Sequence, residues 1–295
     1  TLASKEFSPQ QLKVYKTDPA DERTTTIHDS FPRIASGEES ADPAVLKIIR
    51  QKSFAAWPDA NTELNLRKAW DAVHDGVRFA AYDFDSQPHV RLRMYIAHKA
   101  NLTKPEAVHI EIPDEAGWNR YLKLGRPAFA KQWNEELKLA GIDGDAPVPK
   151  KLQANLARRM KFVREHPEIY VTFMPRGTGL TRLTQDERHL TQTRRRFMLL
   201  GQTLAGQQAL DVWQCIQATR QLDLCKDTPI ELCGYGTTAS LVTVATLFAE
   251  SIRAIHLRDY PASDKEQPDY LNISRFATPG QLLSLIHIPS PRDRG

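Results

Sequence analysis

Apolar and polar residues alternate along residues 77–84 and 90–97. This period of two predicts two half-buried antiparallel strands joined by a turn near residues 85–88. Short apolar runs predict four further strands at 107–112, 169–173, 230–232 and 252–257. Longer segments between them predict helices at 117–139, with a break near Gly125-Arg126-Pro127, and at 150–165, 197–224 and 237–251.

The segment before the first strand is different in character. Residues 1–40 are polar and have few apolar anchors, so we expect an extended lead-in that lies over the main domain. Asp42-Pro43 predicts a helix start, because Asp caps helices and Pro suits the first helical position. This helix is expected to end at Trp57-Pro58, and a second short helix is expected over residues 64–73.

Two strands followed by alternating strands and helices predict an α/β fold. We expect a mostly parallel sheet with helices on both faces and an antiparallel N-terminal hairpin. The chain then divides into a lead-in (1–75), an α/β domain (76–282) and a tail (283–295).

The tail has an unusual sequence. Residues 283–293 resemble the translation of a transposase-type sequencing adapter; the alternative is a genuine apolar strand with a proline-rich end. If the tail comes from an adapter, it is not part of the natural fold, and the last strands of the sheet are missing. The unpaired sheet edge is then expected to aggregate or to pair with another chain.

The composition narrows the classes of function. The 295 residues carry a formal charge of +4, with acidic and basic residues interspersed, so no nucleic-acid partner is predicted. No apolar run is long enough for a bilayer, so no membrane partner is predicted. The three cysteines, Cys215, Cys225 and Cys233, form no metal-ligand pattern, and the histidines form none either. We therefore predict no metal and no cofactor.

The most informative segment follows the predicted strand at 230–232. Gly234-Tyr235-Gly236-Thr237-Thr238 joins that strand to an apolar helix. A strand, a tight glycine turn and a helix are the context of the nucleophile elbow of α/β-hydrolases, in which Gly-x-Ser-x-Gly holds the catalytic serine above the sheet.

Three other matches accompany this elbow. Arg176-Gly177-Thr178-Gly179 follows the strand at 169–173, Asp211 lies in the long helix before the elbow strand, and Arg258-Asp259-Tyr260-Pro261 closes the strand at 252–257. With these motifs the chain resembles the acetyl xylan esterase and cephalosporin deacetylase group of α/β-hydrolases, a bacterial-type group related to prolyl oligopeptidase. The resemblance implies a small ester or carbohydrate-linked acyl ligand, with Arg176, Gly177, Gly234 and Tyr235 as substrate-binding positions.

The departures from this pattern decide the functional prediction. Gly236 stands where the family has its serine, and Thr238 stands where it has the second glycine. The family's acid and histidine follow strands that would lie beyond Leu282. We therefore predict a degenerate esterase domain without a serine nucleophile, acting as a non-catalytic or partner module beside an adjacent hydrolase domain of a larger protein. The alternative is an active carboxylesterase or acetyl esterase with a displaced nucleophile, whose acid and histidine lie in the missing C-terminus.

Each candidate residue has a structural alternative. The backbone N–H of Thr237 matches the family's oxyanion donor, and its side chain is expected to cap the helix. Ser240 is expected to be buried in the helix. Asp259 is a weak candidate acid, and its match is structural. Arg176 is expected to form a salt bridge under the turn rather than to bind a ligand. Arg194-Arg195-Arg196 is expected to be a solvated helix start rather than a nucleic-acid patch.

Overall fold

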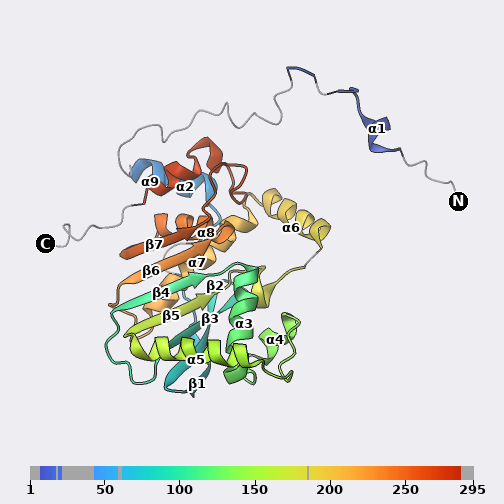
Figure 1. Cartoon of the computed structure of the whole chain (residues 1–295). Coiled ribbons are helices and arrows are strands. Elements are labelled where there is room, and N and C mark those ends of the chain that lie inside the picture. Colours follow the sequence, from blue (N-terminus) through green and yellow to red (C-terminus); the bar gives the residue numbers. More distant parts are fainter. Residues whose placement is uncertain (1–6, 18, 22–42, 59–61, 185, 287–295) are drawn as a thin grey trace.

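The computed structural model describes residues 7–17, 19–21, 43–58, 62–184 and 186–286. Its centre is a seven-stranded sheet in the order β1-β2-β3-β5-β4-β6-β7 (Figure 1). The strands are β1 (Arg67–His74), β2 (Val77–Gln87), β3 (Val90–Lys99), β4 (Ala107–Ile112), β5 (Glu168–Phe173), β6 (Ile230–Tyr235) and β7 (Ile252–Arg258).

The strand directions confirm the predicted fold class. Strands β5, β4, β6 and β7 are parallel neighbours, whereas β3 is antiparallel to β5 and β2 is antiparallel to β3. Strand β2 therefore runs with the four parallel strands, and only β1 and β3 oppose them. The chain goes from β4 to β5 on one side and then returns to β6 on the other. In open α/β sheets, such a reversal of strand order creates a crevice at the carboxyl ends of the strands.

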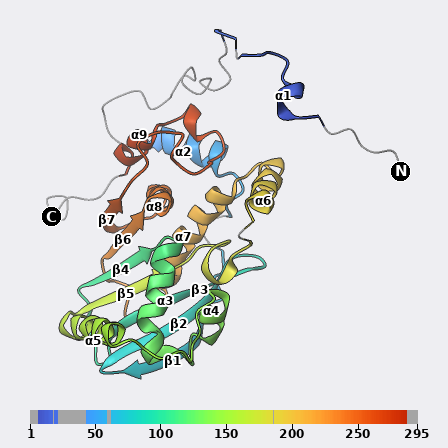
Figure 2. The ribbon, with the colours of Figure 1, turned by 45° about the vertical axis from the view of Figure 1, so that its right-hand side comes forward.

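Helices cover both faces of the sheet (Figures 1 and 2). On one face, β-strand side chains share a hydrophobic core with α2 (Pro43–Ser53), α7 (Leu204–Arg220), α8 (Thr237–Leu247) and α9 (Pro279–Ser284). On the other face, a second core joins β2 and β3 to α3 (Glu115–Phe129), α4 (Asn134–Leu139) and α5 (Lys150–Glu165). The described residues also contain α1 (Pro9–Leu12), α6 (Glu187–Leu199) and the short 3-10 turns Gly179–Thr181 and Ile273–Arg275.

The predicted short helix at 64–73 is wrong, because this segment contains strand β1. Asp75 and Gly76 have φ values of 46° and 70°, and these left-handed conformations suit the tight turn of a hairpin. The turn pairs β1 with β2. The predicted boundary at 75/76 therefore divides a hairpin, and Trp57 and Leu64 also belong to the core of the α/β domain.

Two helix predictions also require correction. Helix α3 continues through Pro127 to Phe129, because buried Phe129 and Trp133 hold this end of the helix. Gly125 permits that packing, since a Cβ atom there would lie 2.1 Å from the Trp133 ring. The predicted helix at 197–224 is two helices, α6 and α7. The break between them contains Gly201, whose φ of 70° ends α6. Helix α7 then begins at Leu204, where Thr203 caps it by accepting the Gly206 N–H at 3.0 Å.

The two ends of the described chain differ in packing. In the lead-in, the side chains of Leu12, Val14 and Tyr15 are exposed, and most of residues 1–40 lies outside the described residues. At the other end, α9 crosses the predicted boundary at 282, and Leu285 is buried in the core. Residues 287–295 of the predicted tail lie outside the described residues.

Candidate functional site

A cleft of about 660 Å³ lies at the carboxyl ends of β4, β5 and β6. The segments that follow these strands form much of its wall, since parallel strands end at the same edge of a sheet. Helix α6 supplies part of the lining. Its lining includes Pro113, Asp114 and Glu115 after β4, Met174, Pro175, Gly177 and Thr178 after β5, and Thr237 and Thr238 after β6.

Gly236 is at the apex of the turn between β6 and α8. Its φ of 53° and ψ of −118° lie outside the regions that residues with a side chain normally adopt. Its N–H donates to the Arg258 carbonyl at 2.8 Å, which joins the apex to the end of β7. A Cβ atom at this position would meet no heavy atom within 4 Å. The apex therefore has a backbone conformation that glycine adopts freely, with open space where a side chain would project.

Gly234 and Thr238 fix the elbow to the sheet. A Cβ on Gly234 would lie 2.7 Å from the Thr238 carbonyl oxygen and 2.8 Å from the Ala239 backbone, so helix α8 requires glycine there. The Thr238 hydroxyl accepts the Tyr235 N–H at 2.9 Å and donates to the Ile112 carbonyl at 2.6 Å. Thr238 thus links the elbow to β4.

Thr237 is the first residue of α8, is exposed and lines the cleft. The first N–H groups of a helix have no acceptor within the helix, and they carry the positive end of its dipole. This helix start can therefore bind a carbonyl oxygen or an anion in the cleft.

Gly236 has no side chain, and the hydroxyl-bearing residues of the described cleft lining are all threonines: Thr178, Thr184, Thr203, Thr237 and Thr238. The cleft lining contains no Ser, Cys or His among the described residues. Ser240 is buried, as predicted, and its Oγ accepts the Tyr270 hydroxyl at 3.2 Å. Burial raises the pKa of the Cys233 thiol and raises that of Cys225 to about 12, so neither thiol is activated as a nucleophile.

Arg176 is engaged beneath the cleft. Its guanidinium donates to both carboxylate oxygens of Asp211, whose side chain is fully buried, and to Gln87 at 2.9 Å. Ser86 donates to the same carboxylate at 2.5 Å. This is the salt bridge under the turn that the sequence favoured over a ligand contact. Gly177, with a φ of 76°, carries the chain from this ion pair into the cleft wall.

Of the seven predicted site residues, only Gly177 and Thr237 line the described cleft; Arg176, Gly234, Tyr235, Gly236 and Asp259 are not among its lining residues. The Tyr235 hydroxyl donates to Glu111 at 3.1 Å, and the Arg258 guanidinium lies 5.7 Å from the ring centre. Asp259 is exposed at the end of β7, with a φ of 50°. The hydroxyl of Tyr235 is thus directed to Glu111, and neither Tyr235 nor Asp259 contributes to the cleft wall.

Several charged residues of the cleft were missed by sequence reasoning. Glu115 accepts the Arg182 guanidinium at 2.7 Å and the Gly179 N–H at 3.3 Å, which joins the start of α3 to the loop after β5. Glu187 and Arg194 come from α6, and Glu266 and Asp269 come from the segment after β7. No local motif marks these residues, because they converge only when the connecting segments fold over the sheet edge.

Arg194-Arg195-Arg196 lies in the second half of α6 rather than at a helix start, and all three residues are exposed. The described residues hold no cluster of His, Cys, Asp or Glu that could bind a metal ion. In the same residues, no helix is long and apolar enough to cross a bilayer.

Comparison with solved structures shows which proteins have a similar fold. A protein of Bacteroides fragilis NCTC 9343 assigned as an acetyl xylan esterase aligns over 89% of this chain and 72% of its own, with 14% identity and a TM-score of 0.63. The chain has the α/β-hydrolase fold. No protein-family model matches the sequence, and no curated protein matches it.

Two other solved structures are similar at lower TM-scores. A CE15 glucuronoyl esterase from Teredinibacter turnerae T7901 has 14% identity and a TM-score of 0.49, over 88% of this chain and 70% of its own. Acetyl xylan esterase 1 from Thermoanaerobacterium sp. JW/SL YS485 has 10% identity and a TM-score of 0.43, over 81% of this chain and 65% of its own. This chain thus spans about two thirds of these enzymes' length.

Proposed function

We propose that this chain is a degenerate esterase-like domain that binds an acyl ligand without hydrolysing it. The observation that carries the proposal is Gly236, which has the positive φ of the elbow and open space above it but no side chain. In serine hydrolases the residue at this apex attacks the carbonyl carbon. Glycine has no atom that can form the acyl-enzyme bond.

Features of the cleft favour binding of a ligand even if no hydrolysis takes place. The start of α8 faces it at Thr237, where N–H groups and the helix dipole favour a carbonyl oxygen or carboxylate. The volume of about 660 Å³ is typical of a small-molecule site. The ligand class we propose is a small ester or an acyl group carried on a carbohydrate, as acted on by the acetyl xylan esterases that share this fold.

A domain of this kind would act as a partner module beside an active hydrolase domain of a longer protein. The chain's coverage of the similar esterases, between 65% and 72% of their length, is compatible with this role.

The proposal is tested first with a fluorophosphonate probe and with p-nitrophenyl acetate. We expect no labelling and no hydrolysis above background, because the described cleft contains no serine, cysteine or histidine. Labelling that persists in Thr237→Ala but disappears with heat denaturation would overturn the proposal and favour the active-esterase alternative.

Ligand binding is tested separately with an acetylated xylo-oligosaccharide, followed by saturation-transfer NMR. Thr237→Pro removes the N–H at the first helical position, where proline is tolerated, whereas Thr237→Ala keeps it. We expect the signal to be lost in the proline variant and retained in the alanine variant. Equal signals in both variants would contradict a role for this helix start.

A further inference from the structure

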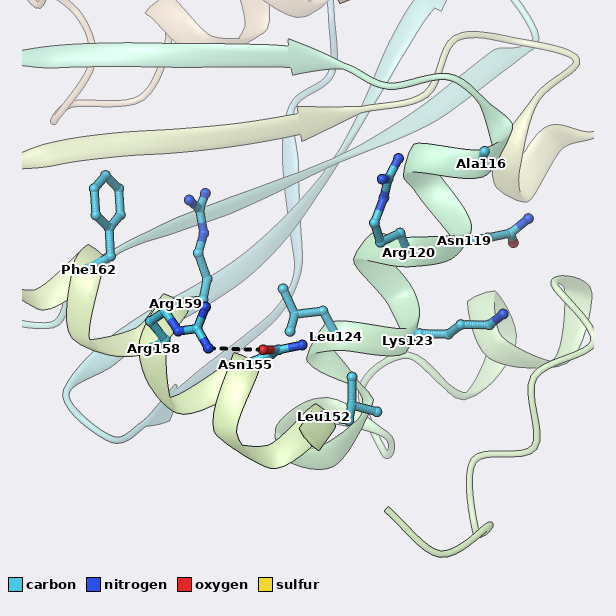
Figure 3. A pocket seen from close by; sticks show the side chains of 10 residues that line it. All are labelled: Ala116, Asn119, Arg120, Lys123, Leu124, Leu152, Asn155, Arg158, Arg159 and Phe162. Atoms are coloured by element: carbon cyan, nitrogen blue, oxygen red, sulfur yellow. Dashed lines mark hydrogen bonds between the residues drawn. The ribbon is translucent and has the colours of Figure 1, made fainter. Parts of the chain in front are cut away.

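A second hollow, of about 1030 Å³, lies between α3 and α5 and is separate from the elbow cleft. Figure 3 shows its ten lining side chains, which all come from these two helices. Leu124 and Leu152 lie between the helices, and Arg120 and Lys123 stand on α3 opposite Arg158 and Arg159 on α5. The hollow is therefore a groove with one wall from each helix.

The charge of this groove is of one sign. Four of its lining residues are cationic, Arg120, Lys123, Arg158 and Arg159, and none is acidic. All four are exposed, and none of them forms an ion pair with any residue in the described part of the chain. Arg158 donates only to Asn155, at 3.4 Å, and Arg159 lies over the Tyr170 ring at 4.9 Å. This uncompensated positive charge attracts an acidic partner.

The floor of the groove is apolar. Leu124 and Leu152 are only partly buried, and Phe162 is 39% exposed. A smaller hollow shares Lys123, Leu152 and Asn155 with the groove, and its other lining residues include Pro149, Lys151 and Asp143. The apolar strip therefore continues toward the start of α5, where its rim carries charges of both signs.

The aromatic content argues against a nucleic acid as the occupant. Single-stranded nucleic acids bind basic grooves by stacking bases on free aromatic rings. Phe162 is the only aromatic residue in the described groove lining, and it already stacks on the His166 ring at 4.1 Å with Arg159 over it at 5.4 Å. A peptide does not need a free aromatic ring in the groove. Its leucine side chains can contact the apolar floor, and its carboxylates can pair with the basic residues of the rim.

We propose that the α3–α5 groove binds an acidic amphipathic peptide segment of a partner protein. The apolar side chains of that segment contact Leu124, Leu152 and Phe162, and its carboxylates pair with Arg120, Lys123 and Arg158. This interaction is independent of the elbow cleft and of the proposed acyl ligand.

The test uses the full chain and a fluorescein-labelled synthetic peptide as long as α5, which has 16 residues. The peptide carries Leu at helical i, i+3, i+4, i+7 spacing and Glu elsewhere, and its counterpart carries Gln in place of Glu. We expect saturable binding in fluorescence anisotropy that weakens with salt, and at least about tenfold weaker binding of the Gln peptide.

Matched variants locate the site. K123E/R158E reverses two groove charges and should abolish binding, whereas K104E/K131E makes the same change in net charge at two exposed lysines outside the groove lining and should not. L152N should weaken binding, whereas L139N, at an exposed position on α4, should not. Thermal melts by circular dichroism establish that each variant is folded, and L152N alone decides the matter if the charge-reversed chain is not.

Absence of binding, or binding that both groove variants leave unchanged, would overturn the proposal. Tighter binding of an oligo-dT or an oligogalacturonate that is insensitive to L152N would also overturn it, because such a ligand uses only the charges.

Discussion

Asp211 accepts three N–H groups from Arg176: the backbone N–H at 2.9 Å, Nε at 2.8 Å and Nη2 at 2.6 Å. The Asp211 side chain is fully buried, and the Arg176 side chain is 12% exposed. This pair fixes the loop after β5 onto α7, and that loop forms one wall of the elbow cleft.

Breaking this ion pair is expected to destabilise the fold strongly. Arg176→Ala leaves a buried carboxylate without its cation and should lower the free energy of unfolding by about 3–5 kcal/mol. Urea denaturation measures this loss. The control is Glu165→Ala, which removes the exposed pair with Lys161 at 3.7 Å and should change stability by at most about 1 kcal/mol. Equal losses in the two variants would mean that the buried pair stabilises the fold no more than the exposed pair does.

Gly234 and Gly280 form a matched pair for a packing test. A methyl group at Gly234 would collide with the backbone of α8, so Gly234→Ala should cost about 1–3 kcal/mol. Gly280 lies in α9 with no neighbour within 4 Å of a Cβ, so Gly280→Ala should stabilise by about 0.5–1 kcal/mol. Thermal unfolding distinguishes the two, and a neutral Gly234→Ala would show that α8 lies farther from β6 than described.

Gly236 is expected to tolerate a side chain at a cost set by the backbone alone. With a φ of 53° but open space around a Cβ, Gly236→Ser and Gly236→Ala should lose the same stability, about 1–3 kcal/mol. Guanidinium denaturation of both variants checks this. A larger loss for serine than for alanine would indicate a collision that the open apex does not predict.

Glu231 makes stability depend on acid pH. Burial raises the pKa of this carboxyl, but hydrogen bonds from Arg253 and His256 outweigh it and lower the pKa below its ordinary value of 4.5. The ionised form is therefore favoured in the folded state, so its stabilising contribution is present above pH 4.5 and is lost as the pH falls through the lower folded pKa. Melting temperatures between pH 3 and 7 should fall less steeply on acidification in Glu231→Gln; parallel curves would contradict this.

The local pattern determined most of the elements. Strand β4 and helix α5 have the bounds that the sequence predicts, Ala107–Ile112 and Lys150–Glu165, because each has a clear period and definite ends. The elbow is equally local, since Gly234 and Gly236 are required by a close approach and by a positive φ.

Other features depend on partners distant in the sequence. Strand β1 is exposed along most of its length, and it is a strand because it pairs with β2. Helices α6 and α7 are separate because Thr203 caps the start of α7. Most residues of α7 are buried, and its length is set by packing against the sheet.

Sequence patterns were thus enough to predict six of the seven strands of the described sheet, the α/β class and the glycine turn at Gly236. Only the tertiary structure decided that Arg176 is held by Asp211, that Tyr235 and Asp259 lie outside the cleft, and that four cations gather between α3 and α5. The physical reason is the range of the interactions. Periodicity and glycine conformation act between neighbours along the chain, whereas burial and charge depend on contacts between residues that only folding brings together.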